Sequence, residues 1–193
     1  DFVLEMPRGP QIIYPKDLGN IVVFADIFPG ATVVEGGLGS GALTSALLRA
    51  VGSTGQVITY EIDEKVVPKA QRNIQKLVPD PSNHSVTVAD IYEGIAERDV
   101  DRVVLDVPEP WHTIPNLATR LRTGGRLACY CPVSTQLEQA WEACDESGLT
   151  VEWAGELIDR AWTRASKGGV RPGNNPMGHT AFLLFAVNLP ALD

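Results

Sequence analysis

The stretch that most constrains this chain is a glycine-rich segment at residues 33–44, V-V-E-G-G-L-G-S-G-A-L-T. A β-branched run precedes it at residues 32–34, and apolar residues at helical spacing follow it over residues 42–50. This order predicts a strand, a tight loop and a helix. Glycines suit such a loop because a residue without a Cβ takes positive φ easily and lets a ligand approach the backbone.

The loop is compatible with two kinds of cofactor. Gly37-x-Gly39-x-x-Ala42 matches the G-x-G-x-x-G/A fingerprint of dinucleotide sites, which alone is weak evidence. Glu35-x-Gly37-x-Gly39-x-Gly41 resembles the E-x-G-x-G-x-G loop of S-adenosylmethionine (SAM) methyltransferases. In those enzymes the loop backbone lies against the methionyl and ribose part of SAM, and the acid helps to orient it. A glycine turn that binds no ligand is the third interpretation.

A second acid fits either cofactor. Glu61 ends a predicted strand at residues 56–62 and lies 20 residues after Gly41 (61 − 41 = 20). A carboxylate at the tip of the second strand can accept hydrogen bonds from both hydroxyls of an adenosine ribose. This spacing occurs with NAD and with SAM, so it predicts ribose binding without separating them.

The rest of the chain alternates between strands and helices. This alternation predicts an α/β fold with a doubly wound, mostly parallel sheet whose ligands bind at the carboxyl ends of the strands. Asp17 is the expected cap of the first helix, and Ser134 or Thr135 that of the last. Further strands are expected at residues 85–89, 100–107, 126–131, 151–157 and 179–187, and helices at 17–27, 64–78, 117–122 and 134–147.

Composition narrows the function classes. The 193 residues suit a single domain, and 44% hydrophobic with 21% charged residues is ordinary for a soluble globular protein. No apolar run reaches the ~20 residues that span a bilayer, and no signal peptide is visible. Three cysteines are too few for a disulfide framework or a zinc site. We therefore expect a cytoplasmic protein without a metal and without a membrane partner.

The charge distribution is uneven. A net charge of −8 disfavours nucleic-acid binding, which depends on Lys and Arg. Yet the segment between Asp159 and Asp193 holds no acid, so a basic patch and a solvated charged loop both remain open. The basic residues of this segment are Arg160, Arg164, Lys167 and Arg171.

The second informative stretch is D-V-P-E-P-W, residues 106–111. It follows an apolar strand, which places Asp106 at the carboxyl edge of the sheet beside the glycine loop. Pro108 and Pro110 stiffen the backbone and remove N–H donors, and Trp111 offers a face for stacking a base. This combination suits methylation of an amino or ring nitrogen. The alternative is a strand-ending Asp in a rigid loop with a core Trp.

Five segments together resemble the tRNA adenine-58 N1-methyltransferases, most closely those of actinobacteria. They are M-P-R-G-P-Q-I-I-Y-P-K-D, V-V-E-G-G-L-G-S-G-A-L-T, L-D-V-P-E-P-W, P-V-S-T-Q-L and R-P-G-N-N-P-M-G-H-T-A-F-L. The resemblance implies a Rossmann-like class I SAM methyltransferase fold with seven strands, the last antiparallel. It also implies SAM as cofactor, methyl transfer to N1 of adenine 58 in the T-loop of tRNA, and a homo-tetramer.

The resemblance also assigns residues. Asp106 would be the catalytic carboxylate, with Tyr14 and Tyr130 flanking the base. His179 and Thr180 belong to the family's closing motif. SAM would be bound by Gln11, Glu35, Gly37, Leu38, Gly39, Ser40, Gly41, Leu43, Thr44, Glu61, Asp90 and Asp106. The substrate would be contacted by Trp111, Arg160, Arg171, His179 and Thr180.

The implied chemistry needs no base. Adenine N1 carries a lone pair, and Asp106 would accept a hydrogen bond from the exocyclic amine and stabilise the positive charge of the product. The base must first be swung out of the RNA. The family's N-terminal β domain is absent from these residues. In the glycine loop, Gly36 and Leu38 stand where the family usually has small residues such as Ala and Thr. Leu38 would then crowd the methionyl group or point to solvent.

Other functions remain open at this point. A non-catalytic subunit with the same fold could bind RNA or a protein partner. An NAD(P)-dependent oxidoreductase meets part of the glycine fingerprint but lacks a Tyr-x-x-x-Lys or similar hydride-transfer set. A methyltransferase acting on a small molecule or a protein is also compatible, because fold does not determine substrate.

Overall fold

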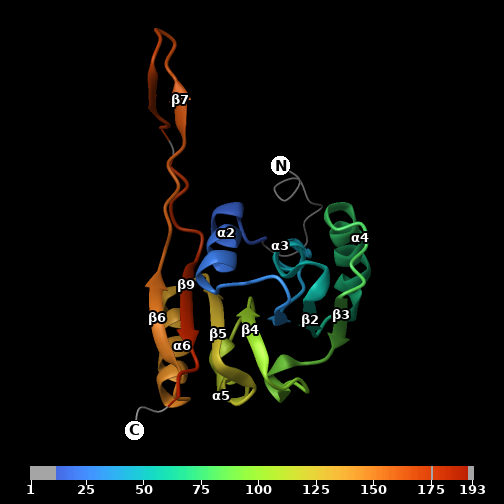
Figure 1. Ribbon diagram of the computed structural model, residues 1–193. Helices are drawn as coiled ribbons and strands as arrows, with labels where there is room; N and C mark the ends of the chain where they lie inside the picture. The colour runs from blue at the N-terminus through green and yellow to red at the C-terminus, as the bar shows by residue number, and fades with distance from the viewer. Residues whose placement is uncertain (1–11, 175, 191–193) are drawn as a thin grey trace.

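Seven strands form one sheet in the order β3-β2-β1-β4-β5-β9-β6 (Figure 1). The computed structural model describes residues 12–174 and 176–190. Strands β1 to β5 pair in parallel, whereas β9 is antiparallel to both β5 and β6. The predicted sheet with an antiparallel last strand is confirmed. The strands are β1 (Thr32–Gly36), β2 (Gln56–Glu61), β3 (His84–Val88), β4 (Val100–Leu105), β5 (Leu121–Cys131), β6 (Thr150–Gly155) and β9 (Phe182–Val187).

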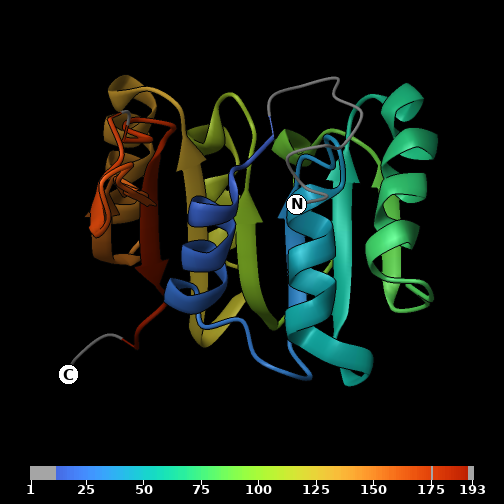
Figure 2. The ribbon, with the colours of Figure 1, turned by 90° about the horizontal axis from the view of Figure 1, so that it is seen from above.

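Helices cover both faces of the sheet and give two hydrophobic cores (Figure 2). α2 (Pro15–Phe24), α3 (Ala42–Val51) and α4 (Val67–Leu77) pack on one face. α5 (Ile114–Ala118) and α6 (Ser134–Glu146) pack on the other. Successive strand side chains alternate between the two cores, which is why the buried strands are apolar on both faces except at Glu35, Thr59 and Arg102. Short 3₁₀ turns are η1 (Gly52–Thr54), η2 (Glu64–Val66), η3 (Ile91–Glu93) and η4 (Pro110–His112).

Three predicted boundaries were wrong for reasons of strand pairing. The helix expected at residues 117–122 ends at Ala118, and β5 begins at Leu121 instead of at residue 126. Leu121 pairs with Val100 of β4 across an irregularity in the ladder, so the Gly124–Gly125 turn lies within the strand. The last strand begins at Phe182 instead of at residue 179. A contact made by a distant strand decides each boundary, and local sequence does not reveal it.

Both predicted helix caps were also wrong. α2 begins after Tyr14, and Asp17 is fully buried in its first turn, hydrogen-bonded to Lys16 and Thr180. α6 begins after Val133, whose N–H donates to the side chain of Gln136. In α2 the carboxyl group of Asp17 is engaged by Lys16 and Thr180 instead of by the helix start. In α6 the side chain of Gln136, and not that of Ser134 or Thr135, accepts the hydrogen bond at the helix start.

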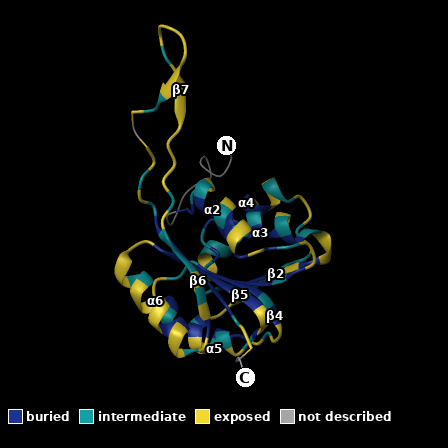
Figure 3. Cartoon of the chain, turned by 60° about the vertical axis from the view of Figure 1, so that its left-hand side comes forward, coloured by how far each residue is buried: buried dark blue, intermediate teal, exposed yellow. Residues whose placement is uncertain are grey.

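An arm formed by residues 158–174 and 176–180 projects from the body (Figure 3). Its core is a hairpin of β7 (Trp162–Arg164) and β8 (Val170–Pro172), which the sequence did not predict as strands. The arm leaves the end of β6 and returns into β9, so it emerges at the carboxyl edge of the sheet. All four basic residues of the segment are exposed on it: Arg160, Arg164, Lys167 and Arg171.

Candidate functional site

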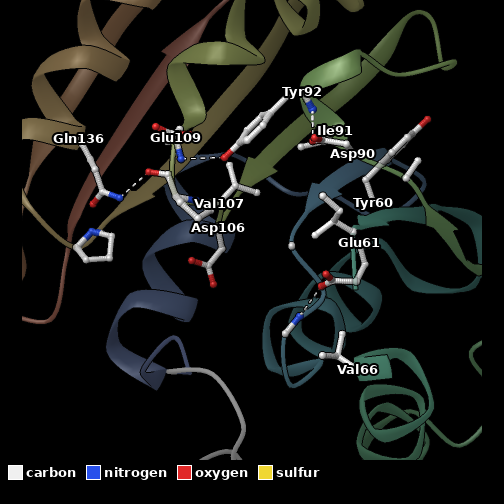
Figure 4. A pocket seen from close by; sticks show the side chains of 16 residues that line it. Tyr60, Glu61, Val66, Asp90, Ile91, Tyr92, Asp106, Val107, Glu109 and Gln136 are labelled. Atoms are coloured by element: carbon white, nitrogen blue, oxygen red, sulfur yellow. Dashed lines mark hydrogen bonds between the residues drawn. The ribbon is translucent and has the colours of Figure 1, made fainter. Parts of the chain in front are cut away.

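A pocket of about 650 Å³ opens at the carboxyl ends of the central strands (Figure 4). It lies where the strand order reverses between β1 and β4, which is the usual ligand position in a doubly wound sheet. The pocket brings together five residues predicted from the sequence, each from a different strand end or from the glycine loop. They are Gly37, Gly39, Glu61, Asp90 and Asp106.

The glycines of the loop are required by the protein's own packing. Gly37 has a φ of +91°, and a Cβ there would lie 2.4 Å from the backbone oxygen of Asp106. Gly41 has a φ of +82°, and a Cβ there would lie 2.7 Å from Cγ1 of Ile74 in α4. Without side chains at these positions, the loop lies directly against β4 and α4, and its outer side faces the pocket.

Leu38 takes neither of the two directions expected for it. Its side chain is 2% exposed and belongs to the core formed with α2, α3 and α4. The cofactor side of the loop therefore presents the backbone of Leu38 and not its side chain. Gly36 is packed as tightly, because a Cβ there would lie 2.9 Å from Ile91 and from Leu105.

Glu61 is held by the glycine loop. Its Oε2 accepts hydrogen bonds from the backbone N–H groups of Leu38 (3.0 Å) and Gly39 (3.4 Å). Its Oε1 accepts from the N–H of Asp63 (2.9 Å). The carboxylate therefore has a fixed orientation at the pocket wall, with lone pairs left for a ligand hydroxyl.

Asp90 follows β3, the strand beside the one that ends at Glu61, and also lines the pocket. Its Oδ1 accepts a hydrogen bond from the backbone N–H of Tyr92 (2.9 Å), which starts the η3 turn. Within the described parts of the chain, its second oxygen accepts no hydrogen bond and stays available for a donor of the ligand. Tyr60 and Tyr92 flank this part of the pocket, and the sequence gave no role to either.

Asp106 differs from the other two carboxylates. Its side chain lines the pocket and makes no hydrogen bond or ion pair with any residue in the described ranges. Desolvation raises the pKa of its carboxyl group to about 7. Near neutral pH, the Asp106 carboxyl is therefore partly ionised and partly protonated. A ligand that donates a hydrogen bond to it stabilises the ionised form.

The two predicted tyrosines lie near each other, and Tyr130 lies near Asp106, although neither tyrosine lines the pocket. Tyr130 is the penultimate residue of β5, whose neighbour Cys129 pairs with Leu105 directly before Asp106. Burial, together with the nearby Asp17, Asp106 and Tyr14, raises the pKa of the Tyr130 phenol above its ordinary value. Its side chain is on the α2 face of the sheet.

Several predicted residues lie outside the pocket wall. Trp111 packs against the core beneath α6 and beside His112, so its ring is not placed to stack on a pocket ligand. Arg160 and Arg171 lie on the arm. Gln11 lies outside the described residues. Ser40, Leu43 and Thr44 are buried behind the glycine loop.

Glu35 forms a buried polar cluster below the loop. Its Oε2 accepts hydrogen bonds from the hydroxyls of Thr44 (2.8 Å) and Thr59 (2.6 Å), which joins β1 to α3 and β2. The side chain is fully buried, and desolvation raises its pKa to about 8. The acid of the loop motif is therefore mostly protonated at neutral pH and supports the loop from beneath.

We expect Glu35→Gln to make the stability fall less steeply between about pH 5 and about pH 8, while the contributions of Asp106 and His84 remain. The folded-state pKa of Glu35 is about 8, above its ordinary value of 4.5, so its contribution to stability is complete below pH 4.5 and is lost as the pH rises through about 8. The loss amounts to about 2–4 kcal/mol. Urea unfolding at several pH values measures it. Because the pKa of Asp106 is also raised, its contribution to the stability of the variant still falls with pH, and the total falls less steeply than in the wild type. Equal slopes in both proteins would contradict the prediction.

His179 and Thr180 join the arm to the body. The ring nitrogens of His179 contact Glu156 Oε2 and the backbone oxygen of Pro132, each at 2.8 Å, and these acceptors raise the pKa of the imidazole. Thr180 donates to Asp17 and accepts from Lys16, both at 2.7 Å. The closing motif thus holds the base of the arm, a role that the sequence did not suggest.

The chemistry of the pocket wall favours one of the two cofactors. Its described residues include four carboxyl groups and no Lys or Arg, which suits a cationic sulfonium compound and disfavours a dinucleotide pyrophosphate. The four carboxyl groups are those of Glu61, Asp90, Asp106 and Glu109.

The described residues contain no group of three or more His, Cys, Asp or Glu that could hold a metal ion. No helix of the described chain is long and apolar enough to cross a membrane.

Sequence comparison finds relatives over most of the chain. A family model described as "tRNA methyltransferase complex GCD14 subunit" matches residues 2–167. The tRNA (adenine(57)-N(1)/adenine(58)-N(1))-methyltransferase TrmI of Methanocaldococcus jannaschii is 35% identical, over 96% of this chain and 74% of that protein. The tRNA (adenine(58)-N(1))-methyltransferase TrmI of Thermus thermophilus is 32% identical, over 95% of this chain and 72% of that protein.

Comparison with solved structures also finds methyltransferases. The tRNA (m1A58) methyltransferase TrmI of Aquifex aeolicus superimposes with a TM-score of 0.87 at 27% identity, over 98% of this chain and 75% of that one. A SAM-dependent O-methyltransferase of Thermotoga maritima superimposes with a TM-score of 0.89 at 33% identity, over 99% of this chain and 71% of that one.

Proposed function

Because the chain belongs to the GCD14 family of tRNA methyltransferase subunits, we propose that it transfers a methyl group from SAM to N1 of adenine 58 in the T-loop of tRNA. The observation that carries this proposal is the pocket in which Asp106, with a raised pKa and no protein partner in the described chain, lies beside the glycine loop. The curated relatives named for the same reaction cover nearly the whole chain.

SAM fits the pocket by shape and by charge. Gly37 leaves room for the backbone of the loop to contact the methionyl and ribose part, Glu61 accepts from the ribose hydroxyls, and Asp90 accepts from the adenine amino group. SAM supplies an electrophilic methyl group on a cationic sulfur. The neighbouring residues Ser40, Leu43 and Thr44 act from behind the loop, and Glu35 supports it, so their contribution to SAM binding is indirect.

Asp106 is the proposed catalytic residue for the target base. Its ionised carboxyl accepts a hydrogen bond from the exocyclic amine of adenine, which enriches N1 in electron density and stabilises the charge that develops on the base. No proton needs to be removed from N1, so no general base is needed. Tyr14 and Tyr130 border the position of the base, and the remaining contribution is alignment of the reacting atoms.

The arm is proposed to meet the RNA backbone. It carries Arg160 and Arg171 at the carboxyl edge of the sheet, the same edge at which the pocket opens. This local positive charge can attract phosphates even though the net charge is −8. We further propose that residues 1–193 act as one catalytic domain, that the protein is cytoplasmic and that it assembles as a homo-tetramer.

Methylation of a defined tRNA tests the proposed function. We expect purified protein to transfer labelled methyl from SAM to a tRNA transcript with adenine at position 58 and not to the same transcript with guanine there. Nucleoside mass spectrometry identifies the product as N1-methyladenosine. Labelling of both transcripts would refute the site. A 2′-O-methylated product would refute N1 chemistry and favour the O-methyl transfer named for the Thermotoga maritima structure.

A binding measurement separates the remaining alternatives. In a thermal melt, a ligand that binds only the folded state raises the midpoint. We expect SAM to raise it and NAD to leave it unchanged. A shift with NAD alone would support an oxidoreductase, and SAM binding without transfer to any RNA would support a non-catalytic subunit.

A further inference from the structure

The loop that carries Asp106 has few internal hydrogen bonds. Pro108 and Pro110 have no N–H group, so two of its five backbone positions, 106–110, cannot donate. Its start is fixed, because the N–H of Asp106 donates to the backbone oxygen of Gly36 at 2.9 Å. Its end is also held, because the N–H groups of His112 and Thr113 in the η4 turn donate to the backbone oxygens of Glu109 and Pro110. The side-chain hydrogen bonds to the backbone between these two ends come from other elements.

Gln136 supplies one of these side chains from the first turn of α6. Its Nε2 donates to the backbone oxygen of Pro108 at 2.7 Å, and its Oε1 accepts from the N–H of Val133 at 3.1 Å. Figure 4 shows the amide of Gln136 directed at the loop from the side opposite Glu61. One side chain thus joins the start of a helix to the loop, two residues after Asp106.

Tyr92 supplies the second side chain from the other wall. Its hydroxyl accepts a hydrogen bond from the N–H of Glu109 at 2.9 Å. Its N–H in turn is bound by Asp90, so the phenol is anchored at the adenine side of the pocket. Adjacent residues of the loop, Pro108 and Glu109, are therefore held from opposite directions.

We propose that Gln136 is a positioning residue for Asp106, with Tyr92 as its counterpart across the loop. The two hydrogen bonds hold residues 106–110 so that the Asp106 carboxyl stays in the pocket, which its desolvation otherwise opposes. This inference rests on the proposed function only for its rate measurement. The claim that the two hydrogen bonds hold the loop is tested separately, by hydrogen exchange of the loop amides.

Gln136→Glu tests the claim with little other change. The variant keeps an oxygen that can accept from Val133 and so preserves the helix start. It cannot donate to the Pro108 oxygen once its new carboxyl group is ionised, so the measurements are made at about pH 8. Gln139→Glu is the matched control, because Gln139 lies on the same helix and is exposed. Tyr92→Phe removes only the hydroxyl on the other side.

The first readout is hydrogen exchange of the backbone amides, measured by mass spectrometry on peptides covering residues 106–113. We expect faster exchange there in Gln136→Glu and Tyr92→Phe, and unchanged exchange in Gln139→Glu. Peptides of α6 should remain protected in all three. Unchanged exchange of the loop in Gln136→Glu would overturn the proposal whether or not the protein methylates tRNA.

The second readout separates kcat from SAM affinity. We expect Gln136→Glu to lower kcat by about tenfold to a hundredfold, because a misplaced reacting group costs that much, and to change the Kd for SAM by less than about twofold. A loss of SAM affinity with kcat unchanged would overturn the positioning role. A wild-type protein without transferase activity would refute the proposed function, and the exchange result would still decide the loop claim.

Discussion

Asp106→Asn is expected to lower the methylation rate of tRNA by about a hundredfold or more, a typical effect of losing one preorganised electrostatic contact at a reacting centre. The amide has nearly the same size, yet it carries no charge to stabilise the cationic base. Asp106 makes no hydrogen bond or ion pair with the described residues, so its loss should not disturb the fold. The measurement is single-turnover methyl transfer with saturating SAM.

The pH profile gives an independent check of the same residue. The pKa of the Asp106 carboxyl is raised to about 7, and its ionised form is the one that accepts from the amine. The wild-type rate should therefore rise with pH through about 7 and then level off. Asp106→Asn should lack this rise and keep its affinity for SAM in calorimetry. An undiminished rate in Asp106→Asn would refute the catalytic role.

Gly37→Ala is expected to abolish SAM binding and to destabilise the fold by about 3–5 kcal/mol. Two effects combine. The φ of +91° is strained for a residue with a Cβ, and that Cβ would lie 2.4 Å from the backbone oxygen of Asp106. Backbone cannot move aside as a flexible side chain can, so the loop must shift away from β4. Urea unfolding and calorimetry with SAM measure the two effects.

Gly148→Ala is the matched control for this substitution. Gly148 has a φ of +74° in the turn after α6, and a Cβ there would meet nothing within 4 Å. This variant therefore bears the strain of positive φ without the clash, and should cost about 1 kcal/mol with SAM binding intact. If Gly37→Ala cost no more than Gly148→Ala, the close approach of the loop to β4 would not matter for stability.

The sequence predicted the elements that repeat a local pattern. The strand, glycine loop and helix at residues 32–51 lie where the β-branched run and the apolar spacing placed them. Glu61, Asp90 and Asp106 each lie at or just after the end of a strand, and the carboxyl ends of parallel strands meet at one edge. These acids were therefore expected to line one pocket, and they do.

Residues whose role depends on a distant contact were missed or misplaced. Trp111 was expected to face a base because it is aromatic and follows Asp106, but the η4 turn packs it against the core beneath α6. Gln136 lies in the P-V-S-T-Q-L segment of the resemblance, but nothing in the sequence assigned it a role, and Tyr92 belongs to no periodic pattern or glycine loop. Their roles come from a proline-containing loop that is brought between them by folding.

The amino-acid sequence alone determined the fold class, the position of the glycine loop and the three carboxylates at strand ends, because periodicity, glycine and chain order are local properties. Only the tertiary structure decided that Leu38 enters the core, that Glu35 supports the loop as a buried acid, and that the basic segment projects as an arm. Each of these depends on which surfaces meet after the sheet has formed. Desolvation and close packing arise only at those contacts, and they direct the side chains.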